Sequence, residues 1–450
     1  MQFRQLLFPA YARLTLASQR AARRTSERGQ LFLAGTVFSA ALGIDTDLTL
    51  VYQLFALLLS MTLISRITVR FQQPNIQAQR ILPKYATAHE PFVYLIRVTN
   101  RGDRVEKNLT ISDIPETINP VIDDFLNKKE PYEHTRNAWD RLISWHRFTW
   151  LQRLRTGIVI GKTTVATLPV KAEKNIKIEA TPLRRGVATL SSINLQKPDP
   201  FGLNYHVKSI HKREQIIVLP KRYPIRKSSS LIGGRHFHPG GINSTWSIGE
   251  SGEFVSLREY RDGDSLKKVH WASSAKLQKL VVKEYEDEYF VRQAVVIDTD
   301  TRDEDLFEEM VSVAASFIYQ TKNGDALTDL FHADRQFHQT TAGRGLGHME
   351  QQMEKLALIK NTPESFPLLP KGLIAQAHLL SNCLLILADW DSRRENLVNQ
   401  LRSFRMHVKV CVIHREPRDT DRGVDFVPLD KIARYLLSPE GAPDVEVEDG

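Results

Sequence analysis

The order of hydrophobic and polar residues divides the chain into three kinds of pattern. Two uncharged runs come first, "LFLAGTVFSAALGI" at residues 31 to 44 and "LTLVYQLFALLLSMTLI" at residues 48 to 64. Short alternating segments separated by Gly, Pro and Asn follow, as is typical of strands and turns. From residue 294 on, apolar strands alternate with segments of helical periodicity. The pattern therefore predicts an α+β multidomain chain with a helical hairpin, a small β-sandwich and a C-terminal α/β domain.

The two uncharged runs predict a transmembrane hairpin within residues 1 to 66. As helices they would span about 21 and 26 Å, against a hydrocarbon core of about 30 Å, so a buried or re-entrant pair is the alternative. Basic residues flank both outer ends, which places both ends in the cytoplasm with Asp45 and Asp47 in a minimal outer turn. These residues are Arg13, Arg20, Arg23, Arg24 and Arg28 before the hairpin, and Arg66, Arg70, Arg80 and Lys84 after it.

Residues 67 to 225 read as the β-sandwich. "FVYLIRVTNRGD", "KNLTISDIPETINPVID" and "KNIKIEATPLRRGVATLSSINLQKPDPFG" alternate in the manner of strands. "GIVIGKTT" has too few residues between its glycines for a phosphate-binding loop, so we expect a strand that turns at Gly161. An aromatic and basic insertion near residues 132 to 156 fits either a helix lying on the anionic membrane surface or an insertion packed on the sandwich.

Residues 289 to 450 follow the βαβ pattern of a mostly parallel sheet. "AVVID", "DALTDLFHAD", "CLLILAD" and "HVKVCVIH" read as strands. Asp298 with Asp300, and Asp389 with Asp391, stand at two carboxyl strand ends, where open sheets form a crevice. These carboxylates either hold a hard cation or cap the following helices. One predicted helical face consists of Leu306, Met310, Val313, Ala314, Phe317 and Ile318.

Composition limits the functions further. The chain has 450 residues, with 42% hydrophobic and 25% charged residues, which is ordinary globular usage. Its net charge of +9 is spread along the chain, and the last eight residues, "PDVEVEDG", are acidic, so we expect no nucleic-acid partner. Cys383 and Cys411 lie in apolar runs, which predicts buried thiols in a reducing compartment.

Residues 226 to 288 contain a charged segment after the glycine-rich "GGRHFHPGG", which we read as a hinge. The segment has one histidine, His270, without a catalytic partner, and its interleaved acids oppose nucleic-acid binding. A structural clasp remains. We expect a turn at residues 262 to 264, with Asp264 capping a short helix, Arg258 pairing with a carboxylate and Trp271 filling an apolar seam.

Three stretches make the chain similar to the bacterial "domain of unknown function 58" family. They are "RRGVATL" with "DPFGL" and "IVLP", then "GEFVSLREYRDGDSLKKVHWASSAK" with "LVVKEYE", then "AVVID" with "CLLILAD". His270 departs from the aspartate usual before the tryptophan. The motif positions that match are Glu253, Phe254, Arg258, Tyr260, Gly263, Asp264, Trp271 and Ala275.

The resemblance implies that the C-terminal domain is a von Willebrand factor type A-like, Rossmann-like fold. Such domains bind a divalent ion through Asp-x-Ser-x-Ser, a threonine and a further aspartate. Here the turn is Asp298-Thr299-Asp300-Thr301-Arg302, so both serines are replaced. We expect no cofactor and a recognition surface that is largely independent of metal, in which Arg302 pairs with Asp298 or Asp389 in place of the metal and receives a carboxylate of the partner. The alternative is a degenerate site for Mg²⁺ at Asp298, Asp300 and Asp389, with Thr340 or Thr341 as the threonine.

The resemblance also implies a function. We expect a non-enzymatic interaction protein, anchored in the lipid of the bacterial inner membrane with most of its chain in the cytoplasm. Its type A-like domain would work with a MoxR-type AAA+ ATPase in the assembly or maturation of other proteins. A metal-dependent hydrolase at the cytoplasmic membrane face is the alternative, and it lacks a nucleophile or general base with a supporting partner in the sequence. The client protein is not readable from the residues.

Overall fold

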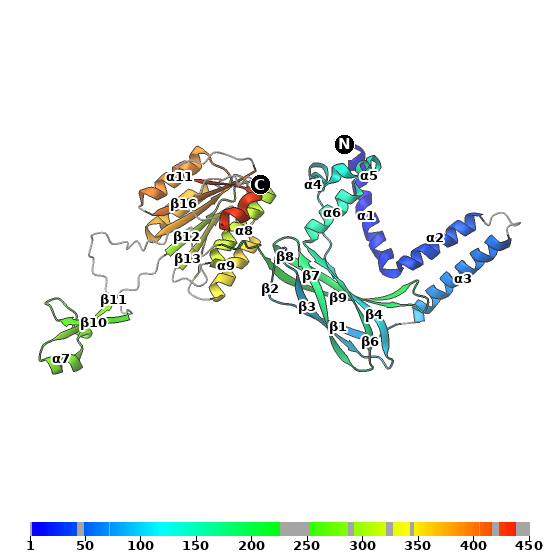
Figure 1. Ribbon diagram of the computed structural model, residues 1–450, viewed down its shortest axis with the longest axis horizontal. Coiled ribbons are helices and arrows are strands. Elements are labelled where there is room, and N and C mark those ends of the chain that lie inside the picture. Colours follow the sequence, from blue (N-terminus) through cyan, green and yellow to red (C-terminus); the bar gives the residue numbers. More distant parts are fainter. Residues whose placement is uncertain are drawn as a thin grey trace, which may run out of the picture. The chain divides into compact units, whose positions relative to one another are not determined.

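The chain is a mixed α/β protein with several sheets, and Figure 1 shows its computed structural model. It forms two compact units. One comprises Met1–Lys221 with Glu354–Leu358, and the other comprises Arg222–Met353 with Ile359–Gly450. The structure describes residues 2–42, 49–71, 73–225, 253–286, 292–320, 327–342, 346–404, 406–415 and 423–437.

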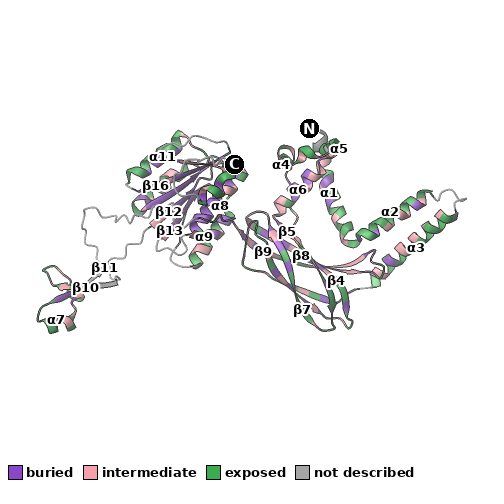
Figure 2. Ribbon diagram, in the orientation of Figure 1, coloured by how far each residue is buried: buried purple, intermediate pink, exposed green. Residues whose placement is uncertain are grey.

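Three helices begin the first unit: α1 (Gln2–Arg24), α2 (Glu27–Leu42) and α3 (Thr49–Phe71). Helices α2 and α3 contact each other, and most of their surface is exposed (Figure 2). Within the described residues, one helical stretch has the length and hydropathy of a membrane span, Leu50–Phe71 in α3. Arg66 and Arg70 lie inside α3, because no helix-breaking residue comes before Pro74. The predicted outer turn lies outside the described residues.

The alternating segments form two sheets around one core, as their pattern predicts. One sheet has the order β1-β3-β7-β5 and the other β2-β9-β8-β4-β6. The neighbours are antiparallel except for β2 and β9. The chain changes sheets at Gly161, between β5 and β6, where the sequence predicts a turning strand. The strands are β1 (Ile76–Ile81), β2 (Tyr85–Thr87), β3 (Phe92–Asn100), β4 (Glu106–Pro115), β5 (Ile158–Ile160), β6 (Lys162–Leu168), β7 (Glu173–Pro182), β8 (Gly186–Pro198) and β9 (Tyr205–Leu219).

The aromatic insertion packs on α1 in a small core of its own. Phe125 and Phe148 are fully buried there against Tyr11 of α1. The packed alternative is therefore the better description of the insertion, which packs mainly on α1 and also contacts strand β5 of the sandwich through α6 (Trp145–Thr156). Trp139 stays 66% exposed outside this core. Helix α4 (Ile122–Asn127) comes just before the insertion, whose helices are α5 (Ala138–Ile143) and α6.

The second unit contains a six-stranded sheet of order β14-β13-β12-β15-β16-β17. Neighbours are parallel except for the edge strand β14. The central strands are almost continuously apolar because helices cover both faces of such a sheet (Figure 2). The strands are β12 (Arg292–Ile297), β13 (Leu327–Ala333), β14 (Phe337–Ala342), β15 (Asn382–Leu387), β16 (His407–His414) and β17 (Asp425–Pro428).

Among the described residues, the helices of this α/β region are α8 (Glu304–Gln320), α9 (Leu346–Leu358, whose last five residues belong to the first unit), α10 (Leu368–Gln376), α11 (Ser392–Ser403) and α12 (Ile432–Leu437). All six residues of the predicted helical face in α8 are buried. Cys383 and Cys411 are free and buried, as their apolar neighbours predict, and burial raises the pKa of both thiols. The sequence did not reveal β14, β17 or α10.

The family motif forms a small module of its own. Strand β10 (Glu253–Glu259) pairs antiparallel with β11 (Val281–Glu286). The 3-10 turn Leu266–Lys268 and helix α7 (Trp271–Leu277) connect these strands. The side chains of Glu253 and Phe254, and the whole glycine-rich hinge, lie outside the described residues.

Candidate functional site

The candidate site lies where the connections of the C-terminal sheet diverge. From β12 the chain continues to β13 and β14 on one side of the sheet, whereas β15 leads to β16 and β17 on the other. The carboxyl ends of β12 and β15 are therefore the topological switch point, where open α/β sheets usually bind their ligands. The loops at this point are residues 298 to 303 and residues 388 to 391.

Asp298 forms the floor of this site and is fully buried. Its backbone N–H donates to the carbonyl of Ile386 at 2.9 Å, which fixes the turn to the neighbouring strand. Its Oδ1 accepts the N–H of Asp300 at 2.9 Å. Its Oδ2 accepts from Nε of Arg394 at 2.8 Å and from Nη2 of the same arginine at 2.7 Å. Both carboxylate oxygens therefore have donors within the protein.

Arg394 comes from the first turn of α11, and its side chain is 4% exposed. It also lies 3.2 Å from a carboxylate oxygen of Asp391 and 3.9 Å from one of Asp300. Its guanidinium carbon lies 4.6 Å from the ring centre of Phe366, at cation–π distance. Desolvation lowers the pKa of Arg394, but Asp298, Asp391 and Asp300 together outweigh it, so the net shift is upward. The arginine is a fixed cation among three carboxylates.

Burial raises the pKa of Asp298, and Arg394 opposes that shift. Desolvation also acts upward on Asp391, yet its bond from the N–H of Arg394 and the nearby arginines lower its pKa overall. That bond, at 2.9 Å, makes Asp391 the N-cap of α11. The helix-cap interpretation is therefore confirmed for Asp391. Asp389 is exposed, and its Oδ1 accepts the N–H of Trp390 at 2.8 Å.

Two predictions about this site need correction. The arginine that pairs with Asp298 is Arg394, whereas Arg302 is exposed near the start of α8. The side chains of Asp298, Asp300 and Asp389 are not assembled for Mg²⁺ either. In the part of the chain that the structure describes, no group of three or more His, Cys, Asp or Glu side chains could hold a metal ion. The physical reason is that the arginine already takes the position beside Asp298.

The threonine prediction fails because of strand direction. Thr340 pairs with Leu330 and Thr341 with Asp329 in the antiparallel edge strand β14. Both therefore lie toward the amino ends of the parallel strands, away from Asp298. Thr341 Oγ1 is there 3.3 Å from Nη2 of Arg292, which also pairs with Asp329.

The loop of residues 361 to 365 closes the site instead. The carbonyl of Thr299 accepts the N–H of Thr362 at 2.8 Å, and Thr299 Oγ1 lies 2.9 Å from Oγ of Ser365. Asp300 Oδ1 accepts the N–H of Glu364 at 2.6 Å. This loop had no signal in the sequence, because its contacts use mainly backbone groups.

A second charged pair lies beside this site. Arg415, after β16, bonds both carboxylate oxygens of Asp303, from Nε at 2.5 Å and Nη2 at 2.8 Å. This bond lowers the pKa of Asp303. Next to the pair is a pocket of about 390 Å³ lined by Arg415 and residues 428 to 431. Charged side chains thus continue along this edge of the sheet.

The family-motif module shows how its charged residues are used. Arg258 pairs with both oxygens of Asp264, at 2.7 and 2.8 Å, as the expected carboxylate partner. The N–H of Arg261 donates to the same side chain at 2.9 Å. Together these bonds lower the pKa of Asp264 to about 2. The predicted turn is present, with Gly263 at φ 105°, a conformation that favours glycine.

Two details of the predicted clasp differ in the structure. Asp264 does not cap the short helix, because Arg258 and Arg261 occupy its oxygens; His270 is the N-cap of α7 through its Nδ1. Trp271 is 65% exposed, so it fills no seam among the described residues. Tyr260 is partly exposed, and its N–H donates to the carbonyl of Leu280 at 2.9 Å.

Comparison with known proteins adds a family match. The model of the family "Protein of unknown function DUF58" matches residues 256 to 380. These residues include most of the motif module and the turn with Asp298. "Uncharacterized protein YeaD" from Bacillus subtilis (strain 168) is 23% identical over 190 residues, 42% of this chain and 46% of that protein. The chain thus spans about half the length of this curated relative.

Solved structures show weak overall similarity. The CARDB domain of a Pyrococcus furiosus protein matches 32% of this chain and 93% of that domain, with 13% identity and a TM-score of 0.16. The alpha-2-macroglobulin of E. coli matches 35% of this chain and 8% of that protein, with 11% identity and a TM-score of 0.18. We base no conclusion on similarities of this size.

Proposed function

We propose that this chain is a membrane-anchored, non-enzymatic interaction protein whose partner binds the carboxyl edge of the C-terminal sheet. As the family resemblance implies, the partner is a MoxR-type AAA+ ATPase, and the complex acts in the assembly or maturation of other proteins. The observation that carries the proposal is the Asp298–Arg394 pair. In the proposal, the guanidinium of Arg394 takes the place of the ion of a type A domain, and the exposed rim of the crevice contacts the partner.

The sheet topology supports a type A-like domain. Its order, β14-β13-β12-β15-β16-β17, corresponds to the doubly wound order 3-2-1-4-5-6. The antiparallel β14 lies at one edge and leaves the crevice between β12 and β15 intact. Asp298 follows the first strand of this sheet, which is the position of the first carboxylate of a type A ion site.

The hydrolase alternative has less support. A catalytic carboxylate or metal-bound water needs an oxygen that is available to the substrate. Asp298 is buried with both oxygens bonded, and one oxygen of Asp300 accepts the N–H of Glu364. Interaction therefore fits this site better than catalysis.

Membrane anchoring rests on α3 and on its attachment to the sandwich. The β8–β9 turn, which contains the "DPFGL" stretch, contacts the start of α2 and the last turns of α3, the two helices of the proposed membrane hairpin. Asn204 Nδ2 donates to Ser65 Oγ at 2.6 Å, and Ser26 Oγ donates to the carbonyl of Gly202 at 2.6 Å. A Cβ at Gly29 would lie 2.1 Å from the carbonyl oxygen of Leu203, so only glycine permits this approach. In the proposal, this turn holds the sandwich at the cytoplasmic face of the inner membrane.

Arg302 is the proposed contact to the partner. It is exposed at the rim of the crevice, and a partner carboxylate would form a charge-assisted pair with it, worth about 1.5 to 3 kcal/mol. Asp300 and Asp391 beside Arg394 would repel misplaced acidic groups and so add specificity.

The test is a pull-down of the MoxR-type ATPase by the full chain in detergent. We compare the wild type with Arg302→Ala and with Arg402→Ala. Arg402 is the matched control, because it is an exposed arginine in the last turn of α11, at the end away from Arg394. We expect Arg302→Ala to weaken binding about tenfold and Arg402→Ala to leave it unchanged. Absence of binding by the wild type would refute the proposed partner. Equal loss in both variants would refute the proposed role of Arg302.

A further inference from the structure

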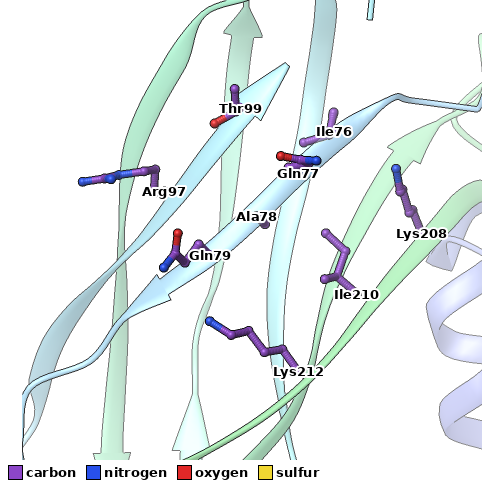
Figure 3. Close-up of a pocket in the computed structure, with 9 residues that line it drawn as sticks. All are labelled: Ile76, Gln77, Ala78, Gln79, Arg97, Thr99, Lys208, Ile210 and Lys212. Carbon is purple, nitrogen blue, oxygen red and sulfur yellow. The ribbon is translucent and has the colours of Figure 1, made fainter. Parts of the chain in front are cut away.

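An open groove lies in the sandwich, and it shares no lining residue with the crevice at Asp298. Its volume is about 570 Å³, and Figure 3 shows the nine residues of β1, β3 and β9 that line it. Ile76, Ala78 and Ile210 supply apolar surface. Arg97, Lys208 and Lys212 supply three cations. The groove therefore combines apolar and cationic lining along the length of a strand.

Both long sides of the groove are strand edges. Strand β1 ends its sheet and pairs only with β3 among the described strands. Strand β9 pairs with β8 on one side, and on the other side the described strand β2 covers only Ile217, Val218 and Leu219, while α1 and α3 also contact β9. Such edges present backbone N–H and C=O groups that can pair with another extended chain.

Hydrogen-bond alternation identifies the free groups of β1. The N–H of Arg101 donates to the carbonyl of Asn75, which makes this a hydrogen-bonded pair of the antiparallel ladder. Gln77 and Gln79 are then also paired toward β3, two and four residues later. The backbone groups of Ile76, Ala78 and Arg80 consequently face the open edge.

A buried arginine keeps the two edges of the groove apart. Arg80 of β1 pairs with Asp113 of β4 and also donates from Nη1 to the carbonyl of Lys212 on β9. This contact crosses from one sheet to the other at one end of the groove, so β1 and β9 do not pair directly. The gap is thus built into the sandwich.

The three basic side chains of the groove favour a negatively charged ligand. Lys208 and Lys212 share one face of β9 with Ile210, because strand side chains alternate. The two lysine positions are about 13 Å apart along the strand. Lys208 Nζ reaches the carbonyl of Pro74, whereas Lys212 and Arg97 each have one carboxylate partner, Glu214 and Glu173 respectively. The Arg97–Glu173 pair is half-exposed, which makes it a weak competitor.

We propose that this groove binds an extended acidic segment of a partner protein, which adds as a strand to the free edge of β1. Acidic side chains at alternate positions would face Lys208 and Lys212, and β-branched residues between them would favour the extended conformation. The six residues of β1 provide about 20 Å of edge, enough for six or seven residues of ligand. This inference is independent of the ATPase proposal.

The test uses a fluorescein-labelled peptide of alternating glutamate and valine, EVEVEVE, and the full chain in phosphatidylcholine nanodiscs. Fluorescence anisotropy measures binding at low ionic strength, where charge pairs are least screened. We expect Lys208→Gln/Lys212→Gln to weaken binding at least about tenfold. The matched control, Lys174→Gln/Lys177→Gln, removes the same charge from exposed positions on β7 outside the groove and should leave binding within about twofold.

Ala78→Pro tests strand addition separately, because it removes an N–H that faces the free edge and none that pairs with β3. We expect Ala78→Pro to weaken binding of the peptide as well. Thermal unfolding of this variant checks that it is folded. A chain shortened at Leu437 controls for competition by the chain's own acidic residues 444 to 449. Failure of both the wild type and the shortened chain to bind EVEVEVE overturns the proposal, as does equal loss in the β7 control. Binding of glycerol phosphate without peptide binding would instead assign the groove to a lipid headgroup.

Discussion

Each unit contains a buried arginine–aspartate pair, and the two pairs have different roles. Arg80 and Asp113 join the two sheets of the sandwich, and both side chains are 0% exposed. Arg394 and Asp298 lie at the carboxyl edge of the C-terminal sheet, with exposures of 4% and 1%. Burial is therefore nearly equal, and what differs is the surroundings of each pair.

The sandwich pair is enclosed on most sides by its neighbours, although Arg80 Nη1 also lies 3.3 Å from Oε2 of Glu214, whose side chain is 23% exposed. Arg80 donates to both oxygens of Asp113 at 2.6 and 2.7 Å, and Tyr94 donates to Asp113 at 2.7 Å. Asp113 in turn helps raise the pKa of Tyr94, after desolvation. At the sheet edge, Arg394 instead serves Asp298, Asp300 and Asp391, and the latter two reach the surface. A pair enclosed by strands acts as a structural bridge, whereas a pair surrounded by loops with spare carboxylates can take part in recognition.

The largest loss of stability should come from removing the cation of the Arg80–Asp113 pair. Arg80→Met leaves the Asp113 carboxylate buried without its cation, so we expect the free energy of unfolding to fall by about 3 to 5 kcal/mol. Denaturant unfolding of the full chain in detergent measures it. Arg80→Met/Asp113→Leu is the control and should recover part of the loss, because it leaves no buried charge without a partner, although the Tyr94 hydroxyl loses its acceptor. A loss below about 1 kcal/mol in the single variant would contradict the structural role.

A smaller and pH-dependent loss should follow at the sheet edge. Arg394→Met removes the cation beside Asp298, and we expect a loss of about 2 to 4 kcal/mol near pH 8. Burial already raises the pKa of Asp298, and the variant raises it further. The folded state then binds a proton that the unfolded state releases, so stability falls as pH rises through the raised folded pKa. Unfolding near pH 5 should therefore show a smaller defect than near pH 8, and an equal defect would contradict this account.

The smallest effect concerns a partly exposed third pair, Arg258 with Asp264. Arg258 lowers the pKa of Asp264 to about 2, below its unfolded value. The contribution of this pair is therefore present above the ordinary aspartate pKa and is lost as pH falls through about 2. NMR titration of Asp264 measures this directly. Arg258→Gln should return the pKa toward about 3.9, and an unchanged value would show that backbone donors alone set it.

The sequence predicted what depends on local pattern. The alternation around Phe92–Asn100, the buried face of α8 and the position of Asp298 after a strand all followed from spacing. It missed short elements such as β17, whose four residues carry too little periodicity.

The choice of arginine at the site was not readable from spacing. Arg302 is next to the turn in sequence, whereas Arg394 lies 96 residues after Asp298 and meets it only through the pairing of β12 with β15. The sequence gives no reason to distinguish Arg393 from its neighbour Arg394, yet the side chain of Arg393 is 59% exposed and that of Arg394 is 4% exposed. The one usable signal was Asp391, because an N-cap fixes which residue of the next turn faces back toward the strand end.

Direct titration of the full chain with Mn²⁺ tests the central claim, that Arg394 occupies the ion position of the crevice. Electron paramagnetic resonance of free Mn²⁺ reports binding without the ATPase, whose own metal requirement would complicate a chelator experiment. The account predicts no stoichiometric Mn²⁺ site in the wild type and no difference from Asp298→Asn. One bound Mn²⁺ per chain that Asp298→Asn abolishes would contradict it and restore the metal site.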